Sequence, residues 1–419
     1  MSKINELIQT LCPDGVEYKK LGEVGMFYGG ITGKSKADFE NGNAKFISYK
    51  NVYSNFAVDQ NTSDRVMMRE DENQRSLQYG DICFTGSSET PDECGFSAVV
   101  TSVPVEPLYL NSFSFFFRFY DLNGINPDYM KYLFRSSDLR YQIGKTAKGV
   151  TRFNVSKELM RCVVIPIPPL PVQEEIVRIL DEYTELEAEL EAKLSEEIKL
   201  KQKQYEVYRD ELLTFGDDVE YKKLGEVATI SRGNGFQKKD FTEVGRPCIH
   251  YGQIFMHYSK MGITTSKTLT CIDDDKYEKN AKALPNDIVM AVTSENVEDV
   301  CKCVVWEGDE PVAVSGHTAI FHTEMNSKFL AYWFGSSDFY VQKVRLAHGT
   351  KVIEVTPAAM VDIVLPVPSL TEQERIVKIL DKYDIYTRDM ISILNTELKS
   401  RKKQYAYYRD QLLTFKRKE

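Results

Sequence analysis

The residues with the most apparent potential for chemistry are acidic side chains near the start of the chain. Asp14 followed by Glu17-Tyr18-Lys19 has the residue types of a nuclease's Asp…Glu-x-Lys pattern. The interval is too short to bracket a metal ion in the usual strand–turn–strand arrangement. The same Glu-Tyr-Lys tripeptide also recurs at 220–222 as part of a longer repeat. We therefore predict no nuclease site.

Cysteine and histidine side chains have spacings that argue against a metal centre. None of the eight cysteines forms a CxxC pair. Cys301 and Cys303 have the alternating spacing of a strand and lack the second pair that a zinc site needs. His317 and His322 are five residues apart, which does not place them on one face of a helix. The sequence predicts scattered buried thiols and no metal site.

Catalytic and cofactor motifs are missing from the sequence. No GxxxxGK[ST] phosphate loop occurs, and neither the glycine-rich cofactor loop nor the short Pro-Pro catalytic motif of a methyltransferase is found. No local motif suggests a Ser/His/Asp or Cys/His set. We therefore predict no catalytic residue in this chain.

Glycine-rich loops with basic neighbours are suited to binding a phosphate backbone, and they lie at 29–36, 145–152, 231–239 and 345–351. Glycine allows the backbone to approach closely and a basic neighbour can meet phosphate, although such loops can also be ordinary solvated turns. The loops 85–89 and 292–295 carry short polar side chains that suit base edges. The candidate DNA-contacting residues are Lys34, Lys36, Tyr49, Lys50, Asn51, Ser87, Ser88, Lys148, Thr151, Arg152, Arg232, Lys238, Lys239, Tyr251, Gln253, Thr293, Ser294, His348 and Lys351.

An internal repeat indicates which elements position these loops. The nonapeptide VEYKKLGEV occurs unchanged at 16–24 and 219–227. A second match relates IPIPPLPVQEEIVRIL at 165–180 to LPVPSLTEQERIVKIL at 365–380. Between these anchors the similarity is faint but keeps its order. Segments that are alike in the two copies should bind a shared partner or form a shared framework. Segments that differ should recognise different targets.

The repeat divides the chain into four segments, which are a variable domain at 1–168, a long helix at 169–215, a second variable domain at 216–368 and a second long helix at 369–419. Each variable domain is predicted to be mixed α/β. Strands are expected at 44–52, 81–85, 97–101 and 112–120, and short helices at 127–136 and 328–336. The run Phe113, Phe115, Phe116, Phe117 and Phe119 is expected to be buried strand.

The segments after the proline-rich linkers are predicted to be long amphipathic helices. Apolar residues recur at steps of three and four along 172–212, and about forty residues at ~1.5 Å rise make a rod of about 60 Å. Residues 172–215 hold 13 acidic and 6 basic side chains, and residues 372–419 hold 12 basic and 8 acidic ones, which suits antiparallel pairing. The residues expected to pair the helices or bind a partner are Gln173, Ile176, Ile179, Leu180, Tyr205, Tyr208, Gln373, Ile376, Ile379, Leu380, Tyr405 and Tyr408.

The expected fold class is therefore α+β, with two mixed α/β domains separated by two long antiparallel helices in a pseudo-two-fold repeat. Residues 6–11 before the first nonapeptide resemble 211–215 before the second, so the two chain ends are expected to lie close together. The net charge of −9 is weak evidence against nucleic acid, because much of it lies in the first helix. With no run of ~18 apolar residues and no signal-peptide pattern, we expect a cytoplasmic protein without a membrane segment.

The segments at 166–180 and 366–380, each heading a long helix after a variable domain, resemble the specificity subunit of type I restriction–modification systems. Gly80-Asp81-Ile82 and Lys148-Gly149 fit the same pattern. The resemblance covers essentially the whole chain. It departs where the second copy has Thr371-Glu372 and the first has Pro171-Val172.

The resemblance implies two target-recognition domains that each read one half of a split sequence in double-stranded DNA. It also implies that two modification subunits dock on the helices and domains, bind S-adenosylmethionine and methylate adenine. Two restriction subunits that use ATP and Mg can join them, and this chain itself would hold no cofactor. Two alternatives are a stand-alone sequence-specific DNA-binding regulator and a coiled-coil interaction scaffold that does not bind DNA.

Overall fold

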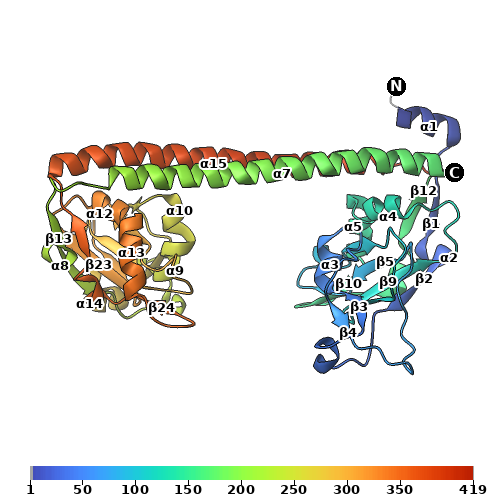
Figure 1. Cartoon of the computed structure of the whole chain (residues 1–419), viewed down its shortest axis with the longest axis horizontal. Coiled ribbons are helices and arrows are strands. Elements are labelled where there is room, and N and C mark those ends of the chain that lie inside the picture. The colour runs from blue at the N-terminus through green and yellow to red at the C-terminus, as the bar shows by residue number, and fades with distance from the viewer. Residues whose placement is uncertain (1–2, 419) are drawn as a thin grey trace. The chain divides into compact units, whose positions relative to one another are not determined.

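Two long helices, α7 (Leu170–Leu212) and α15 (Leu370–Leu412), are each shared between two units of the chain (Figure 1). The computed structural model describes residues 3–418. One unit combines the chain up to Lys193 with the chain from Glu397 onward, and the other is Leu194–Thr396. Each unit holds one mixed α/β domain together with half of each helix, so the units are not the four consecutive segments of the sequence.

Beside shorter strand pairings, the first domain contains two sheets that carry its core. The larger is antiparallel, in the order β2 (Gly25–Gly29), β9 (Ser114–Phe119), β5 (Ile82–Thr85) and β7 (Ser97–Val99). The smaller has the order β4 (Arg65–Val66), β3 (Ala44–Ile47) and β8 (Leu108–Leu110), with β3 and β8 parallel. The phenylalanines of β9 are buried, as the sequence predicts.

Two expectations for the first domain are wrong in detail. Phe113 lies before β9 and is 66% exposed, so it is not part of the buried strand. The strand expected at 44–52 ends at Ile47, because Ser48 caps a short helix, α3 (Tyr49–Ser54), by accepting a hydrogen bond from the Asn51 amide at 3.4 Å. A serine at this position favours a helix start over continuation of the strand.

The second domain repeats this topology and extends it. Its larger sheet has the order β14 (Ala228–Arg232), β23 (Thr318–Thr323), β19 (Ile288–Ala291) and β21 (Cys303–Trp306), followed by β16 (Thr264–Thr265). Its smaller sheet has the order β17 (Thr270–Ile272), β15 (Arg246–Ile249) and β22 (Val312–Val314), followed by β18 (Lys282–Ala283). The internal repeat therefore extends to the strand order, including regions in which the two sequences have diverged.

The repeated nonapeptides lie at the junction of each domain with its helices. In the first copy, β1 (Glu17–Lys20) pairs antiparallel with β12 (Val164–Ile167), the strand that leads into α7. In the second copy, β13 (Tyr221–Lys223) pairs in the same way with β25 (Val364–Pro366), which leads into α15. The unchanged segment thus has the same strand pairing in both copies.

The two ends of the described chain meet in the first unit, as the sequence predicts. Val16 forms a β-bridge with Arg417, and the Tyr18 hydroxyl donates to the Phe415 carbonyl at 3.0 Å. The helix at the start of the chain, α1 (Lys3–Leu11), packs into the core of the same unit through Ile4. These contacts complete the first unit with residues from both ends of the sequence.

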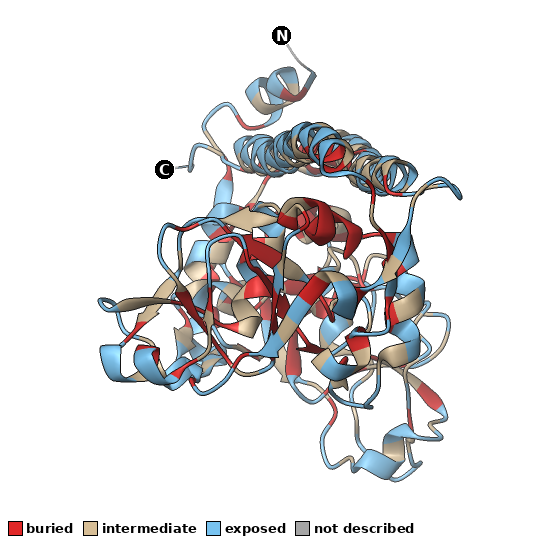
Figure 2. Cartoon of the chain, turned by 90° about the vertical axis from the view of Figure 1, so that its left-hand side faces the viewer, coloured by how far each residue is buried: buried red, intermediate tan, exposed pale blue. Residues whose placement is uncertain are grey.

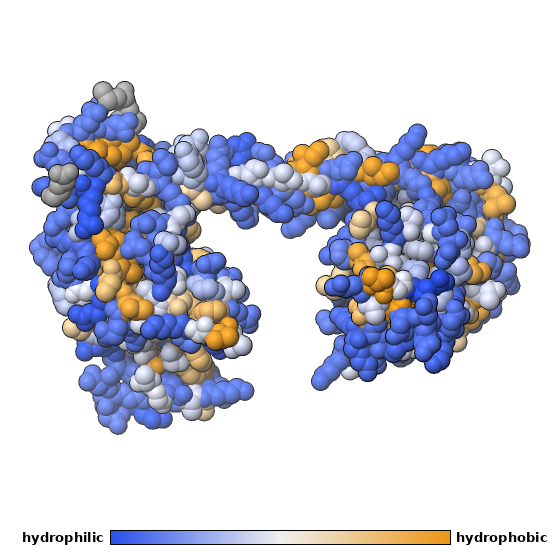
Figure 3. Space-filling model, turned by 180° about the vertical axis from the view of Figure 1, so that it is seen from behind, coloured by the Kyte–Doolittle hydropathy of each residue, from blue (hydrophilic) through white to orange (hydrophobic). Residues whose placement is uncertain are grey.

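Within each unit the two helices lie side by side and antiparallel (Figure 1). In the first unit the rings of Tyr183 and Tyr408 stack at 6.2 Å, and the hydroxyls of Thr184 and Tyr405 are 2.8 Å apart. In the second unit Tyr205 stacks on Tyr383 at 5.9 Å. Helix surfaces turned away from the domains are mostly exposed (Figure 2) and hydrophilic, with small hydrophobic areas (Figure 3). Within residues 3–418, no helix is long and apolar enough to cross a membrane.

A repeated glutamine fastens each domain to its helix. The buried amide of Gln173 accepts from the Asn126 amide at 2.8 Å and donates to the carbonyls of Gly124 and Pro168, both at 2.7 Å. Gln373 accepts from the Asn326 amide at 2.9 Å and donates to a prolyl carbonyl at 2.7 Å. Neither glutamine is available for helix pairing or a partner, because its polar atoms already bind the backbone of its own unit.

The apolar residues that head the helices also face the domains. Ile176 and Leu180 belong to the core of the first unit, and Ile376 and Leu380 to that of the second. Ile179 and Ile379 are half-buried. The beginning of each amphipathic stripe therefore anchors a domain, whereas the tyrosines farther along contact the neighbouring helix.

Candidate nucleic-acid interface

A shallow hollow in the first domain gathers residues from four separated segments. It is lined by Tyr49, Tyr53, Ser87, Ser88, Glu89, Glu93, Phe113, Thr151 and Arg152. Both tyrosines belong to α3, and β6 (Ser87–Ser88) and the turn η2 (Pro91–Glu93) follow the central strand β5. β6 pairs with β11 (Phe153–Val155), so the basic loop ending in Arg152 lies beside the two serines. Sheet pairing thus brings the predicted polar and basic loops together.

Hydrogen bonds fix the side chains of this hollow. The Tyr49 hydroxyl donates to the Ser87 carbonyl at 2.8 Å, and Arg152 Nε donates to Ser87 Oγ at 3.1 Å. The carboxylate of Glu93 accepts from Tyr53 at 3.2 Å and from Ser88 at 3.1 Å. Burial raises the pKa of both tyrosines, so they stay protonated and remain donors at neutral pH.

A second hollow lies in the second domain and has different side chains. It is lined by Gly235, Phe236, Gln237, Lys238, Lys239, His250, Tyr251, Gly316 and His317. Tyr251 begins α9 (Tyr251–Gln253) just as Tyr49 begins α3, and its ring lies 4.5 Å from His250 and 5.2 Å from His317. The two domains therefore present aromatic and charged side chains at related places on one topology, with carboxylates in the first hollow and lysines in the second.

Hydrogen bonds with backbone amides hold both histidines of this second hollow in place. Burial, with the nearby Lys238 and His317, lowers the pKa of His250 to about 4, so its ring is neutral at pH 7. Its Nδ1 accepts from the Gly252 amide at 3.1 Å. His317 is exposed and has a φ of 65°, a left-handed conformation rare for side chains larger than glycine. The Val292 amide donates to its carbonyl at 2.9 Å and holds this turn in place.

The loop tips that carry Phe113 and His317 are equivalent in the two domains. Ser114 pairs with Thr85 at the start of β9, and Thr318 pairs with Ala291 at the start of β23. Phe113 is the residue before β9, and His317 is the residue before β23. An exposed phenylalanine in one copy thus corresponds to an exposed histidine in the other, which is a difference in chemistry at a matched position.

Several predicted residues lie in these hollows or are exposed outside them. Five of them line the first hollow together, namely Tyr49, Ser87, Ser88, Thr151 and Arg152. Three line the second, namely Lys238, Lys239 and Tyr251. Five further candidates are exposed outside the two linings, and they are Lys36, Lys50, Lys148, His348 and Lys351. Arg232 is half exposed and forms an ion pair with Glu354 at 2.9 Å.

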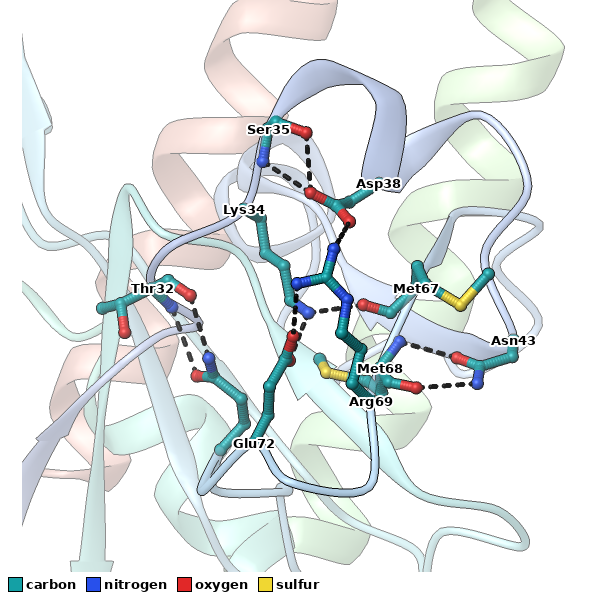
Figure 4. Close-up of polar contacts among 10 residues, drawn as sticks. Thr32, Lys34, Ser35, Asp38, Asn43, Met67, Met68, Arg69 and Glu72 are labelled. Carbon is teal, nitrogen blue, oxygen red and sulfur yellow. Dashed lines mark hydrogen bonds and ion pairs between the residues drawn. The ribbon is translucent and has the colours of Figure 1, made fainter.

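Lys34 is not available for phosphate. Its side chain is only 3% exposed, and its ammonium group contacts the Glu72 carboxylate and the Met67 carbonyl (Figure 4). Asp38 and Arg69 form a second ion pair between the same two loops at 3.4 Å. In the second domain the corresponding loop has a buried Phe236 and an ion pair of Asp240 with Lys276 at 2.7 Å. The structure therefore does not favour the prediction of Lys34 as a DNA contact, because this lysine joins two loops.

Three further candidates have structural roles. Asn51 accepts from the Asp59 amide at 3.1 Å and donates to the Asp59 carbonyl at 2.8 Å. Gln253 accepts from the His250 amide and donates to Thr270, each at 3.0 Å. Thr293 is buried in β20 (Thr293–Ser294), which pairs with β24 (Ile353–Glu354), whereas Ser294 in the same strand is half-buried.

Several residues of the hollows are not among the candidates that the sequence suggests, and they include Tyr53, Glu93, Phe113, His250 and His317. An alignment of the two copies through their strand starts would have matched Phe113 with His317. No comparable signal exists for Glu93, whose contacts to Tyr53 span 40 residues. Within the described chain, no group of three or more His, Cys, Asp or Glu residues is placed to hold a metal ion.

The chain is similar to a known protein family and to individual members of it. The family model described as type I restriction modification DNA specificity domain matches twice, at 13–200 and 216–400. The chain is 31% identical to the type I restriction enzyme EcoR124I/EcoR124II specificity subunit of Escherichia coli over 278 residues, which are 64% of this chain. It spans 66% of that protein's length. A putative type I specificity subunit of Haemophilus influenzae is 27% identical, with coverage of 64% and 68% of the two chains.

Solved structures show the same fold. One chain, from a structure titled as the basis of complex assembly and conformational transition of the type I R-M system, matches with a TM-score of 0.73 at 16% identity. That match covers 95% of this chain and 97% of the other. The HsdS subunit from Thermoanaerobacter tengcongensis matches with a TM-score of 0.50 at 17% identity, over 96% of both chains.

Proposed function

This chain belongs to the family of type I restriction–modification DNA specificity proteins, and from this premise we propose that it is the specificity subunit of such a system. In this proposal the chain selects a sequence in double-stranded DNA and performs no catalysis itself. Each domain reads one half of a split target. The methyl-transfer and restriction chemistry belongs to partner subunits.

The observation that carries the proposal is the pair of hollows at related places in two domains of one topology. The first combines carboxylates, hydroxyls and Arg152, and the second combines two lysines with His250 and His317. The two domains share a fold but present different hydrogen-bond donors and acceptors. Recognition of two different base sequences requires such a difference. Exposed lysines outside the hollows supply contacts to phosphate.

The modification subunits are proposed to number two, one for each unit. Exposed apolar side chains recur at equivalent helix positions in the two units. The first unit exposes Leu186, Tyr407 and Tyr408, and also Tyr183, whose counterpart Tyr383 is half-buried. The second exposes Tyr386, Val207 and Tyr208 at the corresponding places, together with Ile385. Exposed apolar groups on otherwise polar helices suit protein contacts, and a repeated set suits two copies of one partner.

The partners supply the chemistry in this proposal. The modification subunits bind S-adenosylmethionine and transfer its methyl group to adenine N6, and two restriction subunits that use ATP and Mg can join them. The helices set the length of the spacer, which is the number of unread base pairs between the half-sites. Each helix is 43 residues long, or about 65 Å at 1.5 Å per residue.

The proposal is tested by mapping methylated adenines in a host that lacks other DNA methyltransferases. Expression of the chain with its modification subunit should methylate one bipartite sequence, and either protein alone should give no such pattern. Methylation by the lone chain, or a methylation pattern that does not change when the chain is omitted, would contradict the proposal. Sequencing every genomic occurrence of the motif provides the readout.

A further inference from the structure

The first hollow contains two carboxylates, those of Glu89 and Glu93, that binding to the DNA backbone does not explain, and Glu93 is the one that neighbouring hydroxyl groups hold in place. Glu93 lines the hollow beside Arg152, Ser88 and two tyrosines. DNA is a polyanion, so a surface that only held phosphate would gain from basic groups and lose from a carboxylate. In the second hollow no lining residue is acidic. The Glu93 carboxylate therefore needs a role specific to the first domain.

Glu93 is held in position by two hydroxyl groups. One carboxylate oxygen accepts from the Tyr53 hydroxyl at 3.2 Å and the other from Ser88 Oγ at 3.1 Å. Tyr53 is itself fixed, because its ring packs edge-on against Phe96 at 4.9 Å and stacks on Tyr49 at 6.1 Å. Both contacts come from neutral hydroxyls. Each oxygen of an ionised carboxylate has a further lone pair, so Glu93 can accept more hydrogen bonds.

The second domain offers an internal comparison. Ser87 and Ser88 correspond to Thr293 and Ser294, and the same count places Asp299 where the first domain has Glu93. Asp299 is paired with Lys302 and also accepts from Asn296 Nδ2 at 2.9 Å. These bonds lower the pKa of Asp299, and it does not line the second hollow. The second domain thus pairs this carboxylate with a lysine, whereas in the first domain the carboxylate faces the hollow.

We propose that Glu93 is a specificity-determining residue that accepts a hydrogen bond from the exocyclic amino group of a cytosine in the first half-site. This inference rests on the proposed function and names the chemistry of one contact within it. In the major groove cytosine presents its N4 amino donor beside a C–H group. Adenine presents its amino group beside the N7 acceptor, which would repel a carboxylate. Arg152, held by Ser87, can donate to the O6 and N7 acceptors of a guanine nearby.

The test uses the full chain in complex with its modification subunit and a plasmid library randomised across the target sequence. Methylated and unmethylated molecules are sequenced to give the base preference at each position. For Glu93→Gln, whose neutral amide is a weaker acceptor and can turn N–H groups toward the cytosine amino group, we expect the preference for cytosine at one position of the first half-site to fall by about 10-fold, toward the lower end of the range for a bidentate base contact. The second half-site should be unchanged. Asp299→Asn is the matched control and should leave both half-sites unchanged.

A second variant keeps the test decisive. Ser88→Ala removes one of the bonds that position the carboxylate and should weaken the same cytosine preference by a smaller factor. The inference is overturned if Glu93→Gln and Ser88→Ala keep the wild-type preference at every position, or if they lower methylation equally on all sequences. If the wild-type complex itself shows no bipartite preference, the proposed function fails instead, which separates the two outcomes.

Discussion

Replacement of Gln173 by leucine tests how each domain is fastened to its helix. The substitution retains most of the side-chain volume but removes three hydrogen bonds, which leaves the amide of Asn126 and the carbonyls of Gly124 and Pro168 without this partner. A buried polar group left unsatisfied costs about 1–3 kcal/mol. The free energy of opening this junction should therefore fall by roughly 3 kcal/mol or more. The equivalent change, Gln373→Leu, removes two such bonds and should cost about 2 kcal/mol or more.

Hydrogen exchange resolved by peptide measures this effect in each unit separately. Since 1.4 kcal/mol corresponds to a factor of ten, exchange around β1, β12 and the start of α7 should accelerate by roughly 100-fold in Gln173→Leu. Gln373→Leu should accelerate exchange around β13 and β25 by about 30-fold. Each variant should leave the other junction at its wild-type rate. Wild-type protection in Gln173→Leu, or equal acceleration at both junctions, would refute the reasoning.

Three further predictions concern pH, salt and helix length. The pKa of His250 is lowered to about 4 from its ordinary 6.5, so the unfolded chain takes up the proton first and the second unit loses up to about 3 kcal/mol of stability as pH falls from 6.5 to 4. Urea unfolding across this range should show the loss, and His250→Asn should reduce it. Lys148→Ala should weaken DNA binding on all sequences and lower the slope of log affinity against log salt concentration by about one, as measured by fluorescence anisotropy. A loss of affinity confined to one sequence would contradict a phosphate contact. Insertion of one helical turn in α7, ~5.4 Å, should change the spacer in the methylated motif and leave both half-sites intact, and an altered half-site would count against the proposed role of the helix.

The sequence predicts the framework of the fold because that framework is repeated. The unchanged VEYKKLGEV segments take the same place in both domains, where each pairs with the strand that leads into a long helix. The apolar stripe predicts two long antiparallel helices, and the structure has them. The stripe did not reveal that Ile176 and Ile376 contact the domains, because periodicity identifies a buried face but not what covers it.

The hollows were predicted only in part, because their residues are assembled by tertiary contacts. Tyr49, Ser87 and Arg152 came from loops with recognisable composition, and β6 and β11 bring those loops together. Lys34 had the same composition signal yet is buried against Glu72, since a neighbouring loop supplies its partner. Glu93 carried no signal, because an acidic residue in a polar loop is ordinary until Tyr53 and Ser88 are seen to hold it in the hollow.

Exchange of residues 216–368 for the corresponding domain of another member of the family tests the central claim most directly. Methylated adenines are mapped for the parent and the exchanged chain, each with the same modification subunit. If each domain reads its own half-site, one half of the motif changes and the other half is retained. A motif that changes in both halves, or in neither, would contradict the assignment of one half-site to each domain.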